Sequence, residues 1–341
     1  MKREVLRALT IFGLTGFLVA AGPSKYSPAQ SPAAEAEAES LLDANDPLAT
    51  SRAIELLEQS IAAGSLPAIH KLAMALDQRG GKGDLQRARE LLLRHRPAFE
   101  AAHGADHEQM AHYLRALAFV SSHIGLSGEA LEASRKARAH VVELGKYDLW
   151  VAQVDMEIGN YLEDLGRYKE ALASMRSALV VIEKGHGRNH PRTGAVHQNM
   201  GNVYEGQSEY GKALKEYQEA LRVELKNEGP ASIGVAQLYD NIGGLLDRLG
   251  RSEEGLTYFA KATPILAAVL GEQHPNMGRH LADMATLYTA LQRYPEALDR
   301  YDRALPLLID GFGEDSKFVA TVLFRMPRFD SKHIDLESHK K

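Results

Sequence analysis

The 341-residue chain contains no cysteine and a single tryptophan, and its acidic residues only slightly outnumber its basic ones. The absence of cysteine excludes disulfides, thiolate nucleophiles, thiolate metal sites and cysteine-ligated iron–sulfur clusters. The net charge of −5, with lysines and glutamates interspersed, leaves no basic stripe, so nucleic acid is not expected as a partner. Catalytic motifs are also missing: no serine lies in a glycine-flanked elbow, and no P-loop or dinucleotide fingerprint follows a predicted strand. We therefore expect no enzyme and no cofactor.

The sequence does contain a block of forty-two residues that repeats through its middle. Glycines mark the period, with Gly104 one block earlier at a spacing of forty-one: Gly145, Gly187, Gly229, Gly271 and Gly313. A small residue follows fourteen positions after each glycine from Gly104 to Gly271, namely Ala118, Gly159, Gly201, Gly243 and Ala285. A second small residue follows twelve positions later, in each case before leucine, namely Ala130, Ala171, Ala213, Gly255 and Ala297. Small residues at fixed offsets let two helices approach closely, so the period predicts a stacked array of helix pairs.

Four segments superpose without a gap: IGNYLEDLGRYKEAL, MGNVYEGQSEYGKAL, IGGLLDRLGRSEEGL and MATLYTALQRYPEAL. A bulky residue lies one turn after the second small residue of each copy: Met175, Tyr217, Phe259 and Tyr301. From Gly104 to Gly313 the chain resembles tetratricopeptide repeats, specifically the forty-two-residue variety of kinesin light chains. The resemblance implies an all-α fold, a right-handed superhelical solenoid of antiparallel helix pairs, with five repeats in residues 104–312.

The regions outside these repeats predict four further parts. Residues 22–40 are rich in Pro, Ala, Ser and Glu, a composition that predicts a disordered linker. Residues 41–103 resemble the shorter Sel-like helical repeats. After Gly313 the pattern resumes for half a repeat, 313–327, whose single helix is expected to cap the array before Pro327 ends it. Residues 328–341 are expected to be a polar tail.

The first twenty-one residues predict an export signal. Lys2, Arg3 and Arg7 precede an apolar run, and small residues at Val19–Ala21 suit cleavage by signal peptidase. An uncleaved membrane anchor and a buried helix are the alternatives, although about fifteen apolar residues are few for a membrane span. The signal and the anchor both place the repeats outside the cytoplasmic membrane, as a periplasmic, secreted or membrane-anchored protein.

The histidines invite a metal site, because His103 and His107 are four residues apart. His107, however, shares one repeat position with Asp148, His190, Ser232, His274 and Ser316. Asp and Ser at that position are typical helix N-caps, and proline follows both His190 and His274 at the favoured first helical position. We therefore expect capping residues and no metal. Trp150, just inside a predicted helix start, is expected to be a packing residue.

The family resemblance also implies a site. In tetratricopeptide superhelices the first helix of each pair faces a concave groove, and peptide-contacting positions lie at fixed offsets from its small residue. Carried onto this chain, the candidates are Glu157, Asn160 and Glu163 in the second repeat, Gln198, Asn199, Asn202 and Glu205 in the third, and Gln237, Asp240, Asn241 and Asp247 in the fourth. An amide side chain donates and accepts hydrogen bonds, so several in a row suit an extended peptide. The acids of the groove face only Arg248, so the expected partner is neutral or basic, and a carboxylate clamp is not expected.

These features favour a non-catalytic peptide- or protein-binding adaptor outside the cytoplasmic membrane. The alternative is a structural self-assembly module with no peptide ligand and only solvated polar residues in its groove. An exposed patch formed by Phe318, Phe324 and Phe329 would favour that alternative. The sequence leaves the oligomeric state open.

Overall fold

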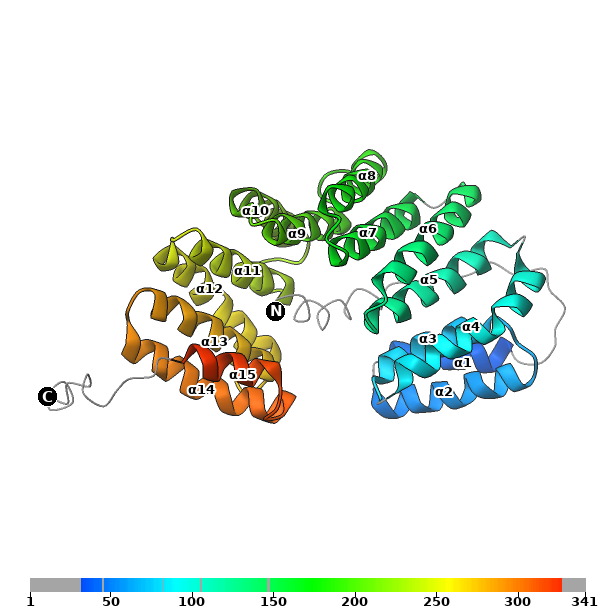
Figure 1. Cartoon of the computed structure of the whole chain (residues 1–341), viewed down its shortest axis with the longest axis horizontal. Coiled ribbons are helices and arrows are strands. Elements are labelled where there is room, and N and C mark those ends of the chain that lie inside the picture. Colours follow the sequence, from blue (N-terminus) through cyan, green and yellow to red (C-terminus); the bar gives the residue numbers. More distant parts are fainter. Residues whose placement is uncertain (1–31, 45, 82, 105, 146–147, 327–341) are drawn as a thin grey trace, which may run out of the picture. The chain divides into compact units, whose positions relative to one another are not determined.

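The computed structural model describes residues 32–44, 46–81, 83–104, 106–145 and 148–326 (Figure 1). The regular structure of these residues is helical, in fifteen helices joined by short loops. The chain divides into two compact units, which meet between Val181 and Ile182 within one helix. The predicted export signal and polar tail lie outside the described residues. None of the described helices combines the length and apolarity that a membrane span requires.

Unit 1 contains the helices up to the boundary. They are α1 (Pro32–Asp43), α2 (Pro47–Ala62), α3 (Ala68–Arg79), α4 (Asp84–His103), α5 (His107–His123), α6 (Ser127–Leu144), α7 (Asp148–Asp164) and the larger part of α8 (Tyr168–His186).

Helix α1 differs from the disordered linker predicted for residues 22–40. Its sequence alternates alanine and glutamate, which are both strong helix formers. Ala38 is fully buried, and Lys71 of α3 bridges Glu35 and Glu39 at 2.8 and 2.7 Å. Helix α1 packs on α2 through alanine and the half-buried Leu41 and Leu42 at its end, and its acids pair with a lysine.

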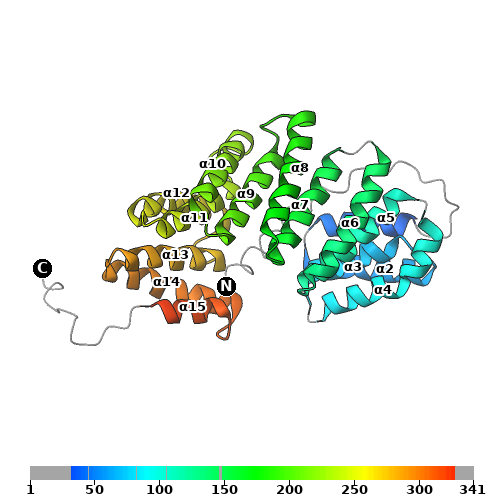
Figure 2. The ribbon, with the colours of Figure 1, turned by 45° about the horizontal axis from the view of Figure 1, so that its top comes forward.

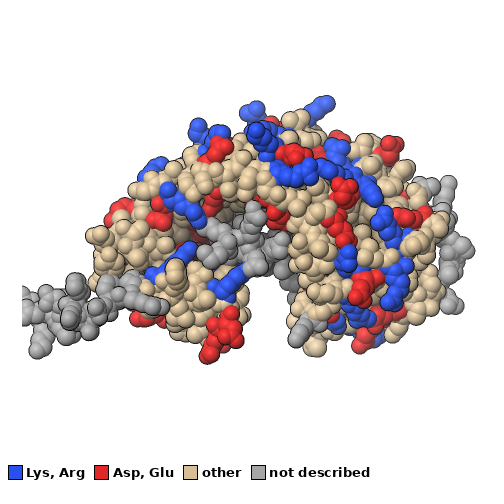
Figure 3. Space-filling view, in the orientation of Figure 1, with Lys and Arg blue, Asp and Glu red and all other residues tan. Residues whose placement is uncertain are grey.

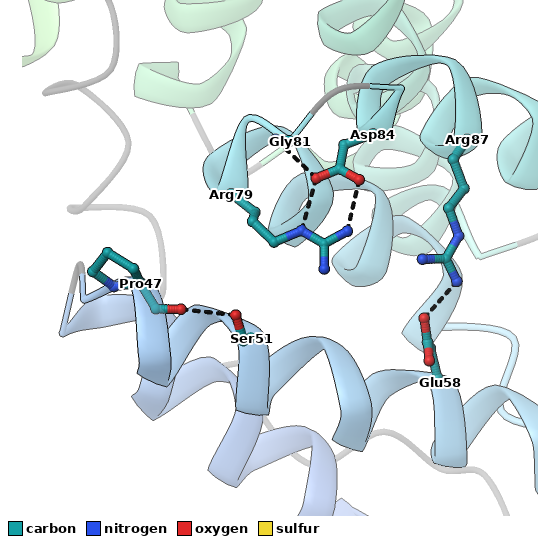
Figure 4. Close-up of polar contacts among 7 residues, drawn as sticks. All are labelled: Pro47, Ser51, Glu58, Arg79, Gly81, Asp84 and Arg87. Atoms are coloured by element: carbon teal, nitrogen blue, oxygen red, sulfur yellow. Dashed lines mark hydrogen bonds and ion pairs between the residues drawn. The ribbon is translucent and has the colours of Figure 1, made fainter. Parts of the chain in front are cut away.

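The turn between α3 and α4 is closed by a two-pronged ion pair (Figure 4). Arg79 donates from Nε and Nη2 to the two carboxylate oxygens of Asp84, at 2.7 and 2.6 Å. The backbone N–H of Gly81 donates to the same carboxylate at 2.9 Å. Nearby, Arg87 of α4 pairs with Glu58 of α2 at 2.5 Å. These contacts close the turn between α3 and α4 and connect α4 to α2.

Unit 2 repeats one helix pair three times and ends on a single helix (Figure 2). Its helices are α9 (Pro191–Gly206), α10 (Tyr210–Asn227), α11 (Ile233–Arg248), α12 (Ser252–Leu270), α13 (Pro275–Ala290), α14 (Tyr294–Phe312) and α15 (Lys317–Arg325). The tightest packing is within the pairs α9–α10, α11–α12 and α13–α14.

The small residues of the repeat let the two helices of a pair approach closely, as the sequence predicted. A Cβ added at Gly243 of α11 would lie 2.7 Å from the Phe259 ring of α12, and one at Gly201 would lie 2.6 Å from the Tyr217 ring. Phe259 and Tyr217 are almost completely buried. Each aromatic ring therefore packs directly on the backbone of the first helix, in space that any larger side chain would occupy.

The glycines that mark the period have a second role. Gly145, Gly187, Gly229, Gly271 and Gly313 all have φ between 64° and 88°. Residues with side chains rarely adopt this left-handed conformation, so glycine is favoured where the chain leaves one pair and enters the next. Gly104 is different: its φ is −58°, as in a helix, so its spacing of forty-one does not mark an equivalent turn.

The first helices of the pairs lie on the inner side of unit 2. Helix α11 contacts α13, and α13 contacts α15, without an intervening second helix. Their outer neighbours α12 and α14 pack mainly within the pairs. A layer whose members touch directly is the shorter, concave layer of a curved stack.

Helix α15 is the half-repeat at the end of the described chain. Val319 and Val322 are buried against α13 and α14. Phe318 is half-buried, and its ring lies 4.7 Å from that of Phe312, whereas Phe324 is 86% exposed. Phe318 and Phe324 therefore do not form the single exposed patch considered above, and Phe329 lies outside the described residues.

Candidate functional site

The repeated capping position is confirmed in unit 2. His190 and His274 accept hydrogen bonds from the backbone N–H two residues later, at 3.3 and 3.1 Å, as N-caps of α9 and α13. Ser232 and Ser316 cap α11 and α15 by accepting from the backbone N–H three residues later. These histidines are therefore used in helix initiation.

The prediction was wrong for His107, the first residue of α5, because Asp106 is the N-cap. His107 instead places Nδ1 at 3.0 Å from Nδ1 of His140. Across the described residues, no three or more His, Asp or Glu side chains come together as metal ligands would. A two-histidine contact supplies too few ligands for a closed zinc site.

We expect zinc or nickel to leave the melting temperature of the protein nearly unchanged. A specific site at a hundredfold excess of metal over its dissociation constant would add about 2.7 kcal/mol to the free energy of unfolding. Thermal unfolding with and without metal checks this. A saturable increase that disappears in a His107→Ala, His140→Ala variant would contradict it.

In unit 1 the candidate acid Glu157 is engaged within the protein. Arg115 of α5 pairs with its carboxylate, and the Nε–Oε2 distance is 3.1 Å. Gln153 donates to Glu157 at 3.1 Å as well. Burial disfavours the charge of Arg115, but the adjacent Glu157 outweighs this effect and raises the pKa of Arg115. Asn160 and Glu163 are half-buried on the same helix.

A row of rings crosses unit 1 beside this pair. His70 of α3 stacks on His112 of α5 with centroids 5.8 Å apart, and His112 lies 4.7 Å from Trp150 of α7. Burial lowers the pKa of His112 to about 4 and that of His70 well below its ordinary value. Both rings are therefore neutral at pH 7, and Trp150 is buried among them as a packing residue.

In unit 2 the acids are also engaged. The hydroxyl of Tyr217 donates to Asn202 at 2.7 Å and to Glu205 at 3.0 Å, and Arg248 lies 3.4 Å from Glu205. Asp247 accepts a hydrogen bond of 2.6 Å from Ser252. The buried Tyr217 thus holds two candidate side chains and connects them to the core.

Asp240 belongs to a buried chain of hydrogen bonds. Its Oδ1 lies 2.9 Å from Nδ1 of His280, whose Nε2 lies 2.8 Å from the hydroxyl of Thr263. Burial raises the pKa of Asp240, and the imidazole offsets part of that increase. The order of groups resembles a hydrolase triad, but the His280 side chain has no exposed surface, and Thr263 donates to the carbonyl of Phe259. The imidazole is therefore enclosed and its hydrogen bonds link α11, α12 and α13.

The four remaining candidates of unit 2 are amides on two successive first helices, and two of them, Asn199 and Asn241, are at equivalent positions. Gln198 and Asn199 lie on α9, and Gln237 and Asn241 lie on α11. All four are half-buried, and their side chains make no hydrogen bond to another described residue.

The sequence reasoning missed basic and aromatic residues of the same register. Applied to the first and fifth repeats, the offsets that selected Asp240 and Gln237 select Arg115, His112 and Arg279. Arg279 is half-buried, stands 5.5 Å from the ring of Phe318, and has its pKa lowered by burial. The candidate positions of all five repeats, taken together, are therefore less acidic than those of the second, third and fourth repeats alone. On the molecular face in Figure 3, acidic and basic side chains are interspersed.

Comparison with known proteins supports the repeat assignment. The family model described as tetratricopeptide repeat matches residues 150–224 and 234–310. These matches do not reach residues 41–103, where the Sel-like resemblance stays a prediction. No curated protein matches the chain.

Several solved structures share the fold at low sequence identity. BtubC (BKLC) from P. vanneervenii is 18% identical, with a TM-score of 0.58 over 74% of this chain and 98% of that one. A putative kinesin light chain from Podospora anserina with TPR-like repeats is 15% identical, with a TM-score of 0.51 over 58% and 94%. A Rap protein complexed with competence and sporulation factor is 13% identical, with a TM-score of 0.58 over 85% and 79%. The chain is thus an all-helical repeat protein whose residues 150–224 and 234–310 match tetratricopeptide repeats, with a fold similar to that of kinesin light chain-type repeats.

Proposed function

We propose that the protein is a non-catalytic adaptor whose inner face in unit 2 binds an extended segment of a partner protein. The observation that carries the proposal is the set of four open amides on α9 and α11. Asn199 and Asn241 are separated by one full repeat, and each has Gln one or four residues before it on the same helix. Such side chains can bond the carbonyl and N–H groups of a peptide backbone whatever its sequence.

The fold is compatible with this use. A Rap protein of similar fold was solved in complex with competence and sporulation factor. Helical stacks of this kind present long inner surfaces built from successive repeats. Fold alone does not determine function. We therefore base the proposal of peptide binding by this chain on its four amide side chains.

The partner segment is proposed to be neutral or basic. Asp247 bonds only a neutral hydroxyl in the contacts described, whereas Glu205 is paired with Arg248 and Asp240 contacts the imidazole of His280. Because part of this acidic surface is already engaged within the protein, we propose that backbone contacts dominate affinity. Charge then acts mainly on association rate and salt dependence.

The double variant Asn199→Ala, Asn241→Ala tests the proposal. Each lost neutral hydrogen bond costs about 0.5 to 1.5 kcal/mol, so affinity should fall roughly five- to a hundredfold. The partner is first obtained by affinity capture from the native envelope, and its isolated binding segment is then titrated by calorimetry.

The matched control is Gln218→Ala, which removes an exposed amide from α10, the second helix of the pair. It should leave affinity unchanged, and circular dichroism should show that all variants fold. If the double asparagine variant binds as tightly as the control, recognition does not use the inner face of α9 and α11.

We further propose that the adaptor acts outside the cytoplasmic membrane, on the basis of the sequence of the first twenty-one residues. Mass spectrometry of the protein from its native host should find an N-terminus near Gly22. An intact Met1 in the membrane fraction would establish the anchor instead. An intact Met1 in the soluble cytosol would contradict export.

A further inference from the structure

The buried hydrogen bonds of Asp240, His280 and Thr263 leave the position of one proton open. Nδ1 of His280 lies 2.9 Å from Oδ1 of Asp240, and Nε2 lies 2.8 Å from the Thr263 hydroxyl. That hydroxyl is also 2.9 Å from the carbonyl oxygen of Phe259 in its own helix, α12. A hydroxyl has one hydrogen to donate, so it can donate to the imidazole or to the carbonyl, but not to both at once.

Each choice suits a different charge state of the imidazole. When the hydroxyl donates to Nε2, His280 is neutral and its Nδ1–H donates to the Asp240 carboxylate. When the hydroxyl donates to the Phe259 carbonyl, its oxygen can accept from an Nε2–H, and the ring is an imidazolium. Thr263 therefore provides a partner for Nε2 whether or not that nitrogen carries a proton.

We propose that Asp240, His280 and Thr263 form a proton switch that sets the charge of the inner face of unit 2. The protonated switch contains a carboxylate and an imidazolium, so it has no net charge. When Nε2 releases its proton to solvent, the Thr263 hydroxyl turns back to Nε2 and the switch carries a charge of −1. The Asp240 side chain is 24% exposed, whereas that of His280 is enclosed, so this charge is presented at Asp240.

The surroundings of the switch stabilise its protonated state. Burial raises the pKa of Asp240, so a lone negative charge there is disfavoured and an imidazolium beside it is favourable. Helix α12 contributes the ring of Phe259, whose centroid is 5.4 Å from that of His280. Helix α13 contributes Arg279 and Asp283, which act on Asp240 in opposite directions. Because these two charges oppose each other, the switch decides the sign of the charge at this place.

The switch lies beside two of the amides that carry the proposed function. Gln237 is one turn before Asp240 on α11, and Asn241 directly follows it. If these amides hold the backbone of a partner segment, a negative charge at Asp240 favours lysine and arginine in that segment. Acidic pH then removes the preference. This effect on binding rests on the proposed function, whereas the proton switch itself does not.

The protonation state of His280 tests the switch without any partner. Long-range ¹H–¹⁵N spectra of the full chain, labelled at histidine, distinguish an imidazolium from a neutral ring, and a His280→Gln variant identifies the signals. We expect the ring to change from neutral to imidazolium as the pH falls from about 8 to about 5, the range in which imidazoles commonly titrate, while circular dichroism stays unchanged. A ring that keeps one state across this range would overturn the proposal.

Two variants of Thr263 test its part in the switch. Thr263→Val keeps the shape but removes the hydroxyl, which leaves the imidazolium with a buried N–H that has no acceptor. That loss costs more than the uncharged hydrogen bond lost by the neutral ring, so the change of state should move about one pH unit lower. Thr263→Ser keeps the hydroxyl and should titrate as the wild type does. Equal titration of the valine and serine variants would show that Thr263 takes no part.

A cationic probe tests the effect on the inner face. Amidated tetralysine, followed by the side-chain amide signals of Gln237 and Asn241, should bind roughly two- to fivefold more weakly at about pH 5 than at about pH 8. Asp240→Asn should remove most of this difference, since other groups that titrate in the same range are present in both proteins. An equal difference in the two proteins would overturn the effect on the inner face.

The switch and the adaptor role fail in different experiments. If Asn199→Ala, Asn241→Ala binds the captured partner segment as tightly as the wild type while His280 titrates as expected, the adaptor role is contradicted and the switch stands. If that variant loses affinity but His280 keeps one protonation state, the adaptor role stands and the switch is overturned.

Discussion

Replacing Phe259 with alanine is expected to lower the free energy of unfolding of unit 2 by about 3–5 kcal/mol. The ring is 1% exposed and packs on the backbone of Gly243, with Met284 and Leu287 of the next repeat beside it. No larger residue stands opposite to fill the space, because the facing position is a glycine. The cavity therefore remains, and the contact between two successive pairs is lost along with the contact within one.

Hydrogen exchange monitored by mass spectrometry measures this effect locally. In a repeat stack each pair contacts mainly its neighbours, so α11, α12 and α13 should lose protection while α5 and α6 keep it. Val269→Ala, at an exposed position of the same helix, should change stability by less than about 0.5 kcal/mol. A loss below about 1 kcal/mol in the Phe259 variant would mean that the pair does not depend on the ring-on-glycine contact.

Unit 1 should lose stability as the pH falls from about 6.5 toward 4. The folded-state pKa of His112 is about 4, below its ordinary value of 6.5, so the unfolded chain binds the proton more tightly. The stabilisation is fully present above pH 6.5 and is lost as the pH falls through the folded pKa. At pH 4.5 the loss from this residue alone is about 2–3 kcal/mol. His70 acts in the same direction, because its pKa is also lowered by burial.

Trp150 is the natural probe for this transition. It is the only tryptophan of the chain, and its ring lies 4.7 Å from that of His112. Urea unfolding followed by its fluorescence, at pH 7 and at pH 4.5, gives the pH dependence of unit 1. Lys71, Arg115, His103 and Asp106 also act on these imidazoles, so the informative quantity is the difference between wild type and His112→Gln. Equal pH dependence in the two proteins would show that His112 is not held neutral by its surroundings.

The helix pairs could be predicted from the sequence because their packing depends on backbone proximity. Gly201 and Gly243 allow an aromatic ring to contact the first helix directly, and no other residue type could replace them without a clash. Such a constraint leaves a small residue, glycine or alanine, at this position in every copy. Periodicity therefore predicts which faces meet.

The failures have physical causes of a different kind. Helix α1 was missed because most of it is stabilised by buried alanine and paired glutamates, and its two leucines come only at its end, after residue 40. His107 was misassigned because the first repeat is offset by one residue, so Asp106 takes the capping position. A one-residue shift at Gly104 changes the backbone conformation there while the spacing remains almost periodic.

The candidate site was only partly predictable. The register located the amides of α9 and α11 on inner helices, because helix faces follow from position alone. It could not show that Glu157 pairs with Arg115 or that Asp240 pairs with a buried histidine, since these partners come from neighbouring repeats. This pairing depends on how side chains of neighbouring repeats point toward one another, and the residue positions within a single repeat do not give that information.

The direct contacts of α13 with α11 and α15 have a consequence for how the chain is made. Each described helix makes its main contacts with helices no more than two elements away along the chain. Almost none of these contacts therefore requires a segment that is distant in the sequence. Structures dominated by short-range contacts fold rapidly, and a stack can grow from any folded pair. We therefore expect each pair to dock on the preceding one while the ribosome is still synthesising the next. A nascent chain that ends after a complete pair should accordingly be nearly as compact, residue for residue, as the finished protein.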